Sequence, residues 1–199
     1  MVMDNPLDRL KKYSVVLASG SPRRRELLSM LGLEFQQCSV DVDETYPSTL
    51  APLEVAPYLS ALKARYYRDN MMLPGQLVIT ADTVVIAHDE VLGKPSSEAD
   101  ARHMLHLLSG CTHQVVTGVS VCVHGGEIRT FSAVTQVSFA QLTDTEIDYY
   151  IRHFHPLDKA GAYGIQEWIG CIGINSIQGS FYNVMGLPLH RLYQFLLQY

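Results

Sequence analysis

Several kinds of segment are missing from this chain. No apolar run approaches the ~20 residues of a membrane-spanning helix, and Met1–Lys12 is polar, without the apolar core of a signal peptide. Basic residues are not in excess, because 15 Lys and Arg face 20 Asp and Glu, for a net charge of −5. We therefore expect no membrane partner and no nucleic-acid partner, since an RNA-binding module needs a basic face with exposed aromatic residues. A local basic pocket for a small anion is compatible with this charge.

Cysteine pairs are also missing. The four cysteines (Cys38, Cys111, Cys122 and Cys171) form no C-x-x-C pair and no metal-binding spacing. We expect them to be reduced and mostly buried, as in a cytoplasmic protein. The 199 residues fit one domain or two closely joined lobes, and a chain of this length needs no disulfide to be stable.

Two common phosphate-binding motifs are absent as well. The chain contains no G-x-x-x-x-G-K-[ST] and no G-x-G-x-x-G after a strand. These absences exclude an ordinary P-loop NTPase and a Rossmann dehydrogenase.

The most informative segment that is present is LASGSPRRRELL, from Leu17 to Leu28. It follows an apolar run that predicts a buried strand, and it opens a periodic stretch that predicts a helix ending near Gly32. Pro22 suits the first helical position and Ser21 suits the N-cap. Backbone N–H groups, hydroxyls and guanidinium groups together favour phosphate oxygens. Arginines in a first turn oppose the helix dipole, which suggests an external anion; a solvated basic turn is the alternative.

The rest of the chain mixes strands and helices. An early strand–helix unit is followed by a meander of strands, which predicts an α/β fold with a mixed sheet. Pro57 is awkward inside its helical pattern, so we expect that helix to start near it or to be kinked there. Strands are predicted at 14–18, 35–40, 77–86, 115–123 and 128–139, and helices at 55–67, 97–108, 143–153 and from 188.

Asp82 is the most informative carboxylate. It interrupts the apolar run Leu77–Ile86, where a buried carboxylate must meet a metal, a cation or a hydrogen-bond donor. As a metal ligand it could also take a proton from an attacking water, whereas a purely structural Asp would be satisfied by backbone N–H groups. Asp41, Asp43 and Glu44 form an acidic loop that either suits a hard divalent ion or is solvated.

Three lysines and one histidine stand near small residues. Lys94 lies between a glycine and a proline, which constrain its backbone, and a lysine is a compact charge suited to phosphate. Lys63 and Lys159 allow the same interpretation, and simple solvation is the alternative for each. For His113 we favour a structural role over that of a general base, and no triad spacing supports Cys111 as a nucleophile.

Together these segments resemble the Maf family of nucleoside triphosphate pyrophosphatases, from Leu17 to about Leu189. The resemblance implies a mixed, twisted α/β sheet with flanking helices, in two lobes around a deep cleft, as in the inosine triphosphate pyrophosphatases. It assigns 13–199 to the enzyme domain and leaves 1–12 as an N-terminal extension. The blocks that carry it are LASGSPRR (17–24), DVDE (41–44), ADTVV (81–85), GKP (93–95), SGCTHQV (109–115), DKAGAYGIQ (158–166) and NVMGLPL (183–189).

The resemblance also implies an activity and a set of residues. The family hydrolyses a nucleoside triphosphate to the monophosphate and pyrophosphate with a divalent metal, which we expect to be Mg²⁺ or Mn²⁺. By position, Asp82 is implied as the proton acceptor and a metal ligand, and Glu44 as a second metal ligand. The residues implied to hold the triphosphate are Ser19, Arg23, Lys63 and Lys94.

One branch of the family acts on dTTP and UTP, and another acts on 7-methyl-GTP. Arg23, Thr83 and Gln166 match the pattern of the dTTP/UTP branch, and a glutamine amide can complement a pyrimidine edge. We therefore expect hydrolysis of dTTP, UTP or a modified pyrimidine triphosphate in a cytoplasmic house-cleaning role linked to cell-division arrest, by a protein that could form a homodimer. The alternative is a non-catalytic, nucleotide-sensing regulator of septum formation.

Overall fold

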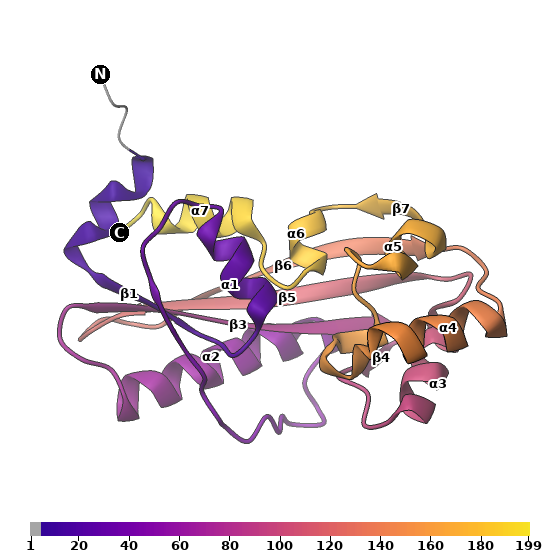
Figure 1. Cartoon of the computed structure of the whole chain (residues 1–199). Helices are drawn as coiled ribbons and strands as arrows, with labels where there is room; N and C mark the ends of the chain where they lie inside the picture. The colour runs from indigo at the N-terminus through magenta and orange to yellow at the C-terminus, as the bar shows by residue number, and fades with distance from the viewer. Residues whose placement is uncertain (1–4) are drawn as a thin grey trace. The chain divides into compact units, whose positions relative to one another are not determined.

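The computed structural model describes residues 5–199 and divides the chain into two compact units (Figure 1). The first unit contains the residues up to Asp82, Thr117–Ala133 and Gly186–Tyr199. The second unit contains Thr83–Val116 and Val134–Met185. Two units agree with the two predicted lobes, whereas the cleft stays a prediction.

The strands form one mixed sheet. They are β1 (Ser14–Ala18), β2 (Gln36–Cys38), β3 (Gln76–Ala87), β4 (Glu90–Leu92), β5 (Thr112–Val123), β6 (Arg129–Phe139) and β7 (Ile174–Gln178). The order is β2-β1-β3-β5-β6-β7, with β4 paired to β3, which makes seven strands. β1 runs parallel to β2 and β3, while β4 and β7 are antiparallel to their neighbours. The predicted mixed α/β fold is confirmed.

The helices begin mostly where their capping residues predict. Ser21, Ser97 and Thr143 each accept a backbone N–H at a helix N-terminus, and Thr143 forms a full capping box with Glu146. The α-helices are α1 (Pro22–Ser29), α2 (Pro52–Asn70), α3 (Glu98–Leu108), α4 (Asp144–Phe154), α5 (Trp168–Gly173), α6 (Phe181–Val184) and α7 (Leu189–Leu196). The 3₁₀ helices are η1 (Pro6–Lys12), η2 (Pro156–Asp158) and η3 (Ala160–Ala162).

Of the two alternatives for Pro57, a start of α2 near it is wrong, and a kink there stays a prediction. The helix begins at Pro52, and Pro57 lies inside it. Pro52 occupies a first-turn position where no N–H is needed, while Pro57 costs α2 one backbone hydrogen bond. Ala51, the N-cap, offers no side-chain cap, so the sequence carried no capping signal there.

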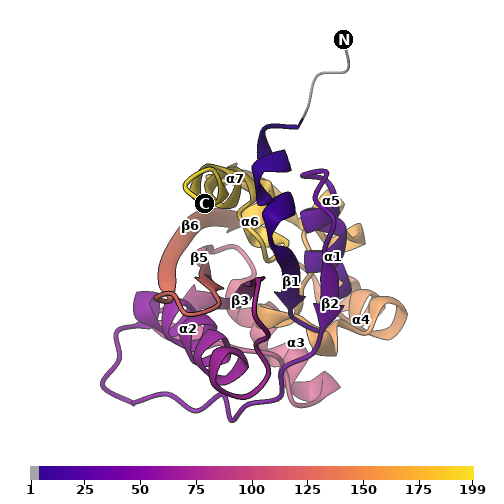
Figure 2. The same ribbon diagram turned by 90° about the vertical axis from the view of Figure 1, so that its left-hand side faces the viewer.

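In the first unit, helices cover both faces of the strands. α2 lies on one face, and α1 and α7 lie on the other (Figures 1 and 2). Gly118 on β5 allows α2 to come close, because a Cβ at Gly118 would lie 2.3 Å from the Pro57 nitrogen. On the α2 face, Tyr67 packs with Val16 and Val78. This packing sets the distance between α2 and β3, which matters for the site below.

The segment before β1 also packs into the first unit. η1 buries Leu7 and Leu10, and the Asn5 amide donates to the Leu31 carbonyl at 2.8 Å. Lys12 Nζ donates to the carbonyl oxygen of Tyr199 at 2.6 Å. The first four residues of the predicted extension lie outside the described residues.

The second unit has its own apolar core. α3 packs against α4, η2 and η3, and Leu105, Ile147 and Tyr150 are fully buried within one cluster. Gly161 permits the close approach of η3, since a Cβ there would lie 2.8 Å from a methyl group of Val85. This core supports the glycine-rich segment at 158–166.

The cysteines are free thiols, as expected, but the expectation that most are buried is wrong. Only Cys122 is buried; Cys38 and Cys111 are half-buried and Cys171 is exposed. Cys38 ends an edge strand and Cys111 follows the C-terminus of α3, so neither lies within a core. Over residues 5–199, none of the helices is long and apolar enough to cross a membrane.

Candidate active site

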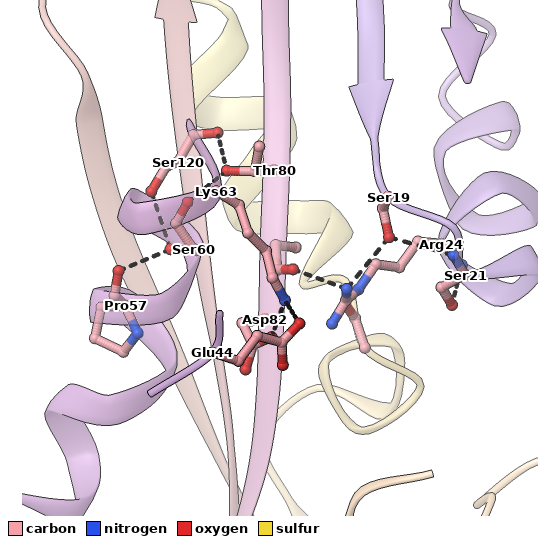
Figure 3. Close-up of polar contacts among 12 residues, drawn as sticks. Ser19, Ser21, Arg24, Glu44, Pro57, Ser60, Lys63, Thr80, Asp82 and Ser120 are labelled. Atoms are coloured by element: carbon pink, nitrogen blue, oxygen red, sulfur yellow. Dashed lines mark hydrogen bonds and ion pairs between the residues drawn. The ribbon is translucent and has the colours of Figure 1, made fainter. Parts of the chain in front are cut away.

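Asp82 lies on β3 with its side chain toward α2. It is only 7% exposed, and its Oδ1 accepts a hydrogen bond of 2.5 Å from Lys63 Nζ (Figure 3). Lys63 is itself 9% exposed. The prediction that this buried carboxylate must meet a metal, a cation or a donor is confirmed, and the partner is a lysine ammonium.

The same ammonium binds a second carboxylate. Glu44, from the loop after β2, places Oε1 2.9 Å from Lys63 Nζ, and its side chain is 48% exposed. Of the other acids in this loop, Asp43 accepts the Thr45 backbone N–H, and both Asp41 and Asp43 are exposed. Two carboxylates thus converge on one lysine side chain.

A chain of hydroxyl groups holds α2 in place beside Lys63. Ser60 lies one turn before Lys63 on the same helix face, and its Oγ is 2.9 Å from Ser120 Oγ. Thr80, two residues before Asp82 on the same strand face, donates to the Ser60 carbonyl at 2.7 Å. Ser120 Oγ also lies 2.8 Å from Thr130 Oγ1. These bonds fix the register of α2 against β3 (Figure 3).

The turn between β1 and α1 is braced by side chains. Ser19 Oγ accepts the Ser21 backbone N–H at 3.3 Å. Gln37, on β2, donates its amide to the carbonyl oxygens of Ser19 and Ser21 at 2.7 and 3.4 Å. The sequence did not single out Gln37, because a glutamine in an edge strand carries no local signal. The brace leaves the N-terminus of α1 in a defined position next to Ser19.

Arg24 is the main residue that the sequence reasoning missed. Its guanidinium donates to the carbonyls of Gly186 and Ala81, each at 2.8 Å, and to Ser19 Oγ at 3.3 Å (Figure 3). Burial lowers the pKa of Arg24, and the nearby Asp82 charge works in the opposite direction. The unusual arginine in the first turn thus has partners inside the protein. It links the Ser19 turn to the residue that precedes Asp82.

The remaining predicted residues are divided between the units. Arg23 is half-buried on α1 in the first unit. Thr83 is the first residue of the second unit and follows Asp82 directly on β3. Because successive strand residues alternate, its side chain points to the opposite face of the strand from that of Asp82. Lys94 is exposed in the turn between β4 and α3, and Gln166 is exposed in the segment before α5. The contacts of the first unit bring together Glu44, Lys63 and Asp82.

His113 has the surroundings of a structural histidine. It is 2% exposed, with Nε2 2.8 Å from the Tyr163 hydroxyl and its ring packed edge-on against Phe139 and Tyr163. Burial lowers its pKa from 6.5 to about 4. A neutral imidazole inside an aromatic cluster supports the structural interpretation.

Glu44 and Asp82 supply carboxylate oxygens of the kind that a divalent metal ion prefers. Across residues 5–199, no group of three or more His, Cys, Asp or Glu side chains is arranged to hold a metal. The two carboxylates nevertheless meet at a single cationic position, that of Lys63 Nζ. Mg²⁺ prefers oxygen ligands and is commonly held by one or two carboxylates together with substrate phosphates and waters. The donor set present therefore suits such an ion.

Comparison with known proteins gives a consistent family. A family model described as Maf-like protein matches residues 14–199. The chain is 56% identical over 188 residues to the dTTP/UTP pyrophosphatase of Phocaeicola vulgatus, covering 94% of this chain and 96% of that protein. It is 50% identical over 188 residues, with the same coverage, to the dTTP/UTP pyrophosphatase of Bacteroides thetaiotaomicron.

Solved structures resemble the fold. The structure of a HAM1 protein from Coxiella burnetii matches with a TM-score of 0.56 and 16% identity, over 94% of this chain and all of that one (100%). The Staphylococcus aureus Ham1 protein matches with a TM-score of 0.53 and 16% identity, over 93% of this chain and 98% of that one. These likenesses agree with the mixed α/β fold of this chain.

Proposed function

Because this chain belongs to the Maf family, we propose that it hydrolyses dTTP and UTP to the monophosphates and pyrophosphate. The relatives at 50–56% identity named above are dTTP/UTP pyrophosphatases over nearly their whole length. Modified pyrimidine triphosphates are further substrates within this proposal. The four free thiols suit a reducing compartment, and we place the activity in the cytoplasm.

The observation that carries the proposal is the convergence of Glu44 and Asp82 on Lys63. A buried carboxylate paired with a lysine is costly to desolvate, so a purely structural role gives little stability in return. In a hydrolase the same three groups serve the reaction, because hydrolysis needs a proton acceptor and positive charge near the phosphates. We assign Asp82 as the proton acceptor.

The triphosphate is held, in this proposal, by Ser19, Arg23, Lys63 and Lys94. The Ser19 turn presents its hydroxyl beside the N-terminus of α1, where free N–H groups and the helix dipole favour phosphate oxygens. Arg23 provides a fork of N–H donors, and the lysines provide compact charges. Glu44 and Asp82 would hold the divalent ion, Mg²⁺ or Mn²⁺, which when bound neutralises phosphate charge.

The chemical step follows from the position of Asp82. Lys63 binds Oδ1, so the second carboxylate oxygen, Oδ2, receives the proton of a water molecule. The water oxygen attacks the α-phosphorus, and the bond from that phosphorus to the oxygen bridging to the β-phosphorus breaks. Pyrophosphate leaves with the bonding electron pair, and its charge is stabilised by Arg23, Lys63 and Lys94. Positioning and electrostatic stabilisation supply most of the rate enhancement.

We propose that Arg23, Thr83 and Gln166 select the base. A uracil or thymine edge offers an N–H donor flanked by carbonyl acceptors, and the exposed Gln166 amide offers both an acceptor and donors. A site that hydrogen-bonds these groups rejects a base that presents the wrong pattern.

A screen for pyrophosphate release tests the proposal. Common and methylated nucleoside triphosphates are supplied with Mg²⁺ or Mn²⁺, and the wild type is compared with Asp82→Asn. We expect turnover of dTTP and UTP, and a kcat lower by a factor on the order of 10² to 10⁴ in the variant. Turnover confined to 7-methyl-GTP would overturn the base selectivity, and binding without any turnover would favour the nucleotide-sensing alternative.

A matched pair of variants tests the acidic loop. Glu44→Gln removes a charge that contacts Lys63, whereas Asp43→Asn removes a neighbouring charge whose Oδ1 only accepts the Thr45 N–H. We expect Glu44→Gln to raise the concentration of Mg²⁺ needed for half-maximal rate and Asp43→Asn to leave it unchanged. Equal effects would show that only the general acidity of the loop matters.

A further inference from the structure

Gln166 belongs to a short turn that is clamped from within the second unit. The Glu167 N–H donates to the Gly164 carbonyl at 3.0 Å, which closes the turn around Gln166. Gly164 and Ile165 are buried, while Gln166 itself is exposed. The direction of its side chain therefore depends on what holds the two ends of the turn.

The Tyr150 hydroxyl holds both ends. Tyr150 lies on α4 and is fully buried. Its oxygen accepts the Gly164 N–H at 2.9 Å, and its O–H donates to Glu167 Oε2. One hydroxyl thus bridges the residue two before Gln166 and the residue directly after it.

Glu167 is held on its other side as well. Lys159 Nζ lies 3.1 Å from Glu167 Oε1 and 2.7 Å from Asp158 Oδ1, and Lys159 is buried. Burial raises the pKa of Tyr150 and the neighbouring Glu167 carboxylate raises it further, so the tyrosine stays an O–H donor at neutral pH. The carboxylate therefore has a partner at each oxygen.

Gly164 shows how tightly the turn is packed. A Cβ at this position would lie 2.8 Å from Glu167 Cδ and 3.1 Å from Gln166 Nε2. The Glu167 carboxylate cannot move away cheaply, because Tyr150 and Lys159 hold it. The Gln166 amide is thus close to a rigid part of the turn.

We infer that Tyr150 and Glu167 are positioning residues that fix the orientation in which the Gln166 amide meets the base. The inference rests on the proposed function, in which Gln166 selects the pyrimidine. A glutamine amide that rotates freely can pair with uracil or cytosine, since it carries both an acceptor and donors. Selectivity requires a restricted orientation, and the clamp from Tyr150 and Glu167 contributes to it by holding the turn that carries Gln166.

A pair of neighbouring tyrosines gives a matched test. Tyr150→Phe keeps the ring and removes the hydroxyl, whereas Tyr149→Phe removes the hydroxyl of an exposed tyrosine that stacks on His153. The readouts are the ratio of kcat/KM for UTP to that for CTP, and the ratio of Kd for the α,β-imido analogue of dCTP to that for the dUTP analogue. We expect both ratios to fall roughly tenfold in Tyr150→Phe and to keep their wild-type values in Tyr149→Phe.

A second background separates positioning from simple stabilisation. In a Gln166→Ala protein, adding Tyr150→Phe should lower neither ratio further, because the clamp acts only through Gln166. An effect of Tyr150→Phe that persists in this background overturns the inference. So does a folded Tyr150→Phe protein that keeps the wild-type ratios. If Tyr150→Phe fails to fold, Glu167→Ala breaks the clamp at a half-buried position, and the same loss of selectivity is expected.

The two readouts keep this inference distinct from the proposed function. If the wild type hydrolyses no triphosphate, the proposed function falls, while the Kd ratio of the imido analogues still tests the clamp. If the wild type binds both analogues equally, the inference about Tyr150 and Glu167 is overturned whatever the turnover.

Discussion

Arg24 gives a test at the scale of single residues. Its guanidinium reaches three acceptors, on Ser19, Ala81 and Gly186, which a compact lysine ammonium cannot contact together. We expect Arg24→Lys to lower the free energy of unfolding by about 1–3 kcal/mol, because acceptors lose their partner. We also expect kcat/KM to fall on the order of tenfold, since the Ser19 turn loses its link to β3.

The neighbouring arginine is the control for this variant. Arg25 is exposed, and its backbone N–H and carbonyl bond to Ser21 and Ser29, so Arg25→Lys should match the wild type in urea unfolding and in steady-state kinetics. If Arg24→Lys behaves like Arg25→Lys, the link between the turn and β3 contributes neither to stability nor to activity.

His113 makes stability depend on pH. Its pKa is about 4 in the folded protein against 6.5 in the unfolded chain, so between these values the unfolded chain binds a proton that the folded protein excludes. The stability that His113 contributes is present above pH 6.5 and is lost as the pH falls toward 4, by about 3 kcal/mol in total.

Urea unfolding between pH 7 and 4 measures this loss. We expect the slope of unfolding free energy against pH to be shallower in His113→Gln, which cannot titrate, and unchanged in His190→Gln, at an exposed position. Carboxylates titrate in the same range, so the difference between the two variants is the relevant quantity. Parallel curves would contradict a buried, neutral His113.

At the scale of helices and strands, local signals predicted most boundaries. Serine and threonine caps located α1, α3 and α4, because a side-chain oxygen that satisfies an N–H is a property of the adjacent sequence. The start of α2 was missed, because Ala51 offers no capping signal, and Pro57 favoured either a later start or a kink. The close contact of Pro57 with Gly118 joins residues that are far apart in sequence. Long-range packing decides such cases, and a single sequence does not display it.

Gly118 provides the test at this scale. A Cβ there would lie 2.3–2.4 Å from backbone atoms of Ala56 and Pro57, so Gly118→Ala must push α2 away from β5. Because α2 carries Lys63, we expect kcat/KM to fall on the order of tenfold or more, with unfolding easier by about 1–3 kcal/mol. The measurements are steady-state hydrolysis of dTTP and urea unfolding.

Gly125→Asn is the control in the same hairpin. Gly125 has φ +75° with no atom near an added Cβ, and asparagine tolerates this backbone conformation. The Gly125→Asn protein should hydrolyse dTTP at a rate close to that of the wild type. A Gly118→Ala protein with wild-type activity would mean that α2 adapts without moving Lys63.

At the scale of the whole molecule, the sequence motifs identified the family and one buried charge cluster. Asp82 was predictable because a carboxylate in an apolar strand needs a partner. The family resemblance singled out Lys63 as a triphosphate-binding residue and Glu44 as a metal ligand, but it did not predict that Lys63 pairs with Asp82 and Glu44, which lie far from it in sequence. Arg24, Gln37 and Tyr150 could not be predicted, because each acts through contacts with segments that the sequence alone does not place nearby.

Ligand binding should stabilise the whole chain. β3, β5 and β6 each contribute residues to both compact units, so we expect one cooperative unfolding transition. A ligand at about 100 times its Kd adds about 3 kcal/mol, which for a chain of this length raises Tm by roughly 5–10 °C. The probe is the α,β-imido analogue of dUTP with Mg²⁺, followed by differential scanning calorimetry.

Two controls make the shift informative. The α,β-imido analogue of dCTP at the same concentration should raise Tm less, because selective binding means a higher Kd and hence a smaller logarithmic term. Mg²⁺ alone should raise Tm little, since two carboxylates already paired with Lys63 make a weak site without phosphate oxygens. Equal increases in Tm with both analogues would show that the site recognises the triphosphate and does not distinguish the base. If calorimetry shows two transitions and the ligand raises the Tm of only one of them, the two units unfold separately, although β3, β5 and β6 run through both.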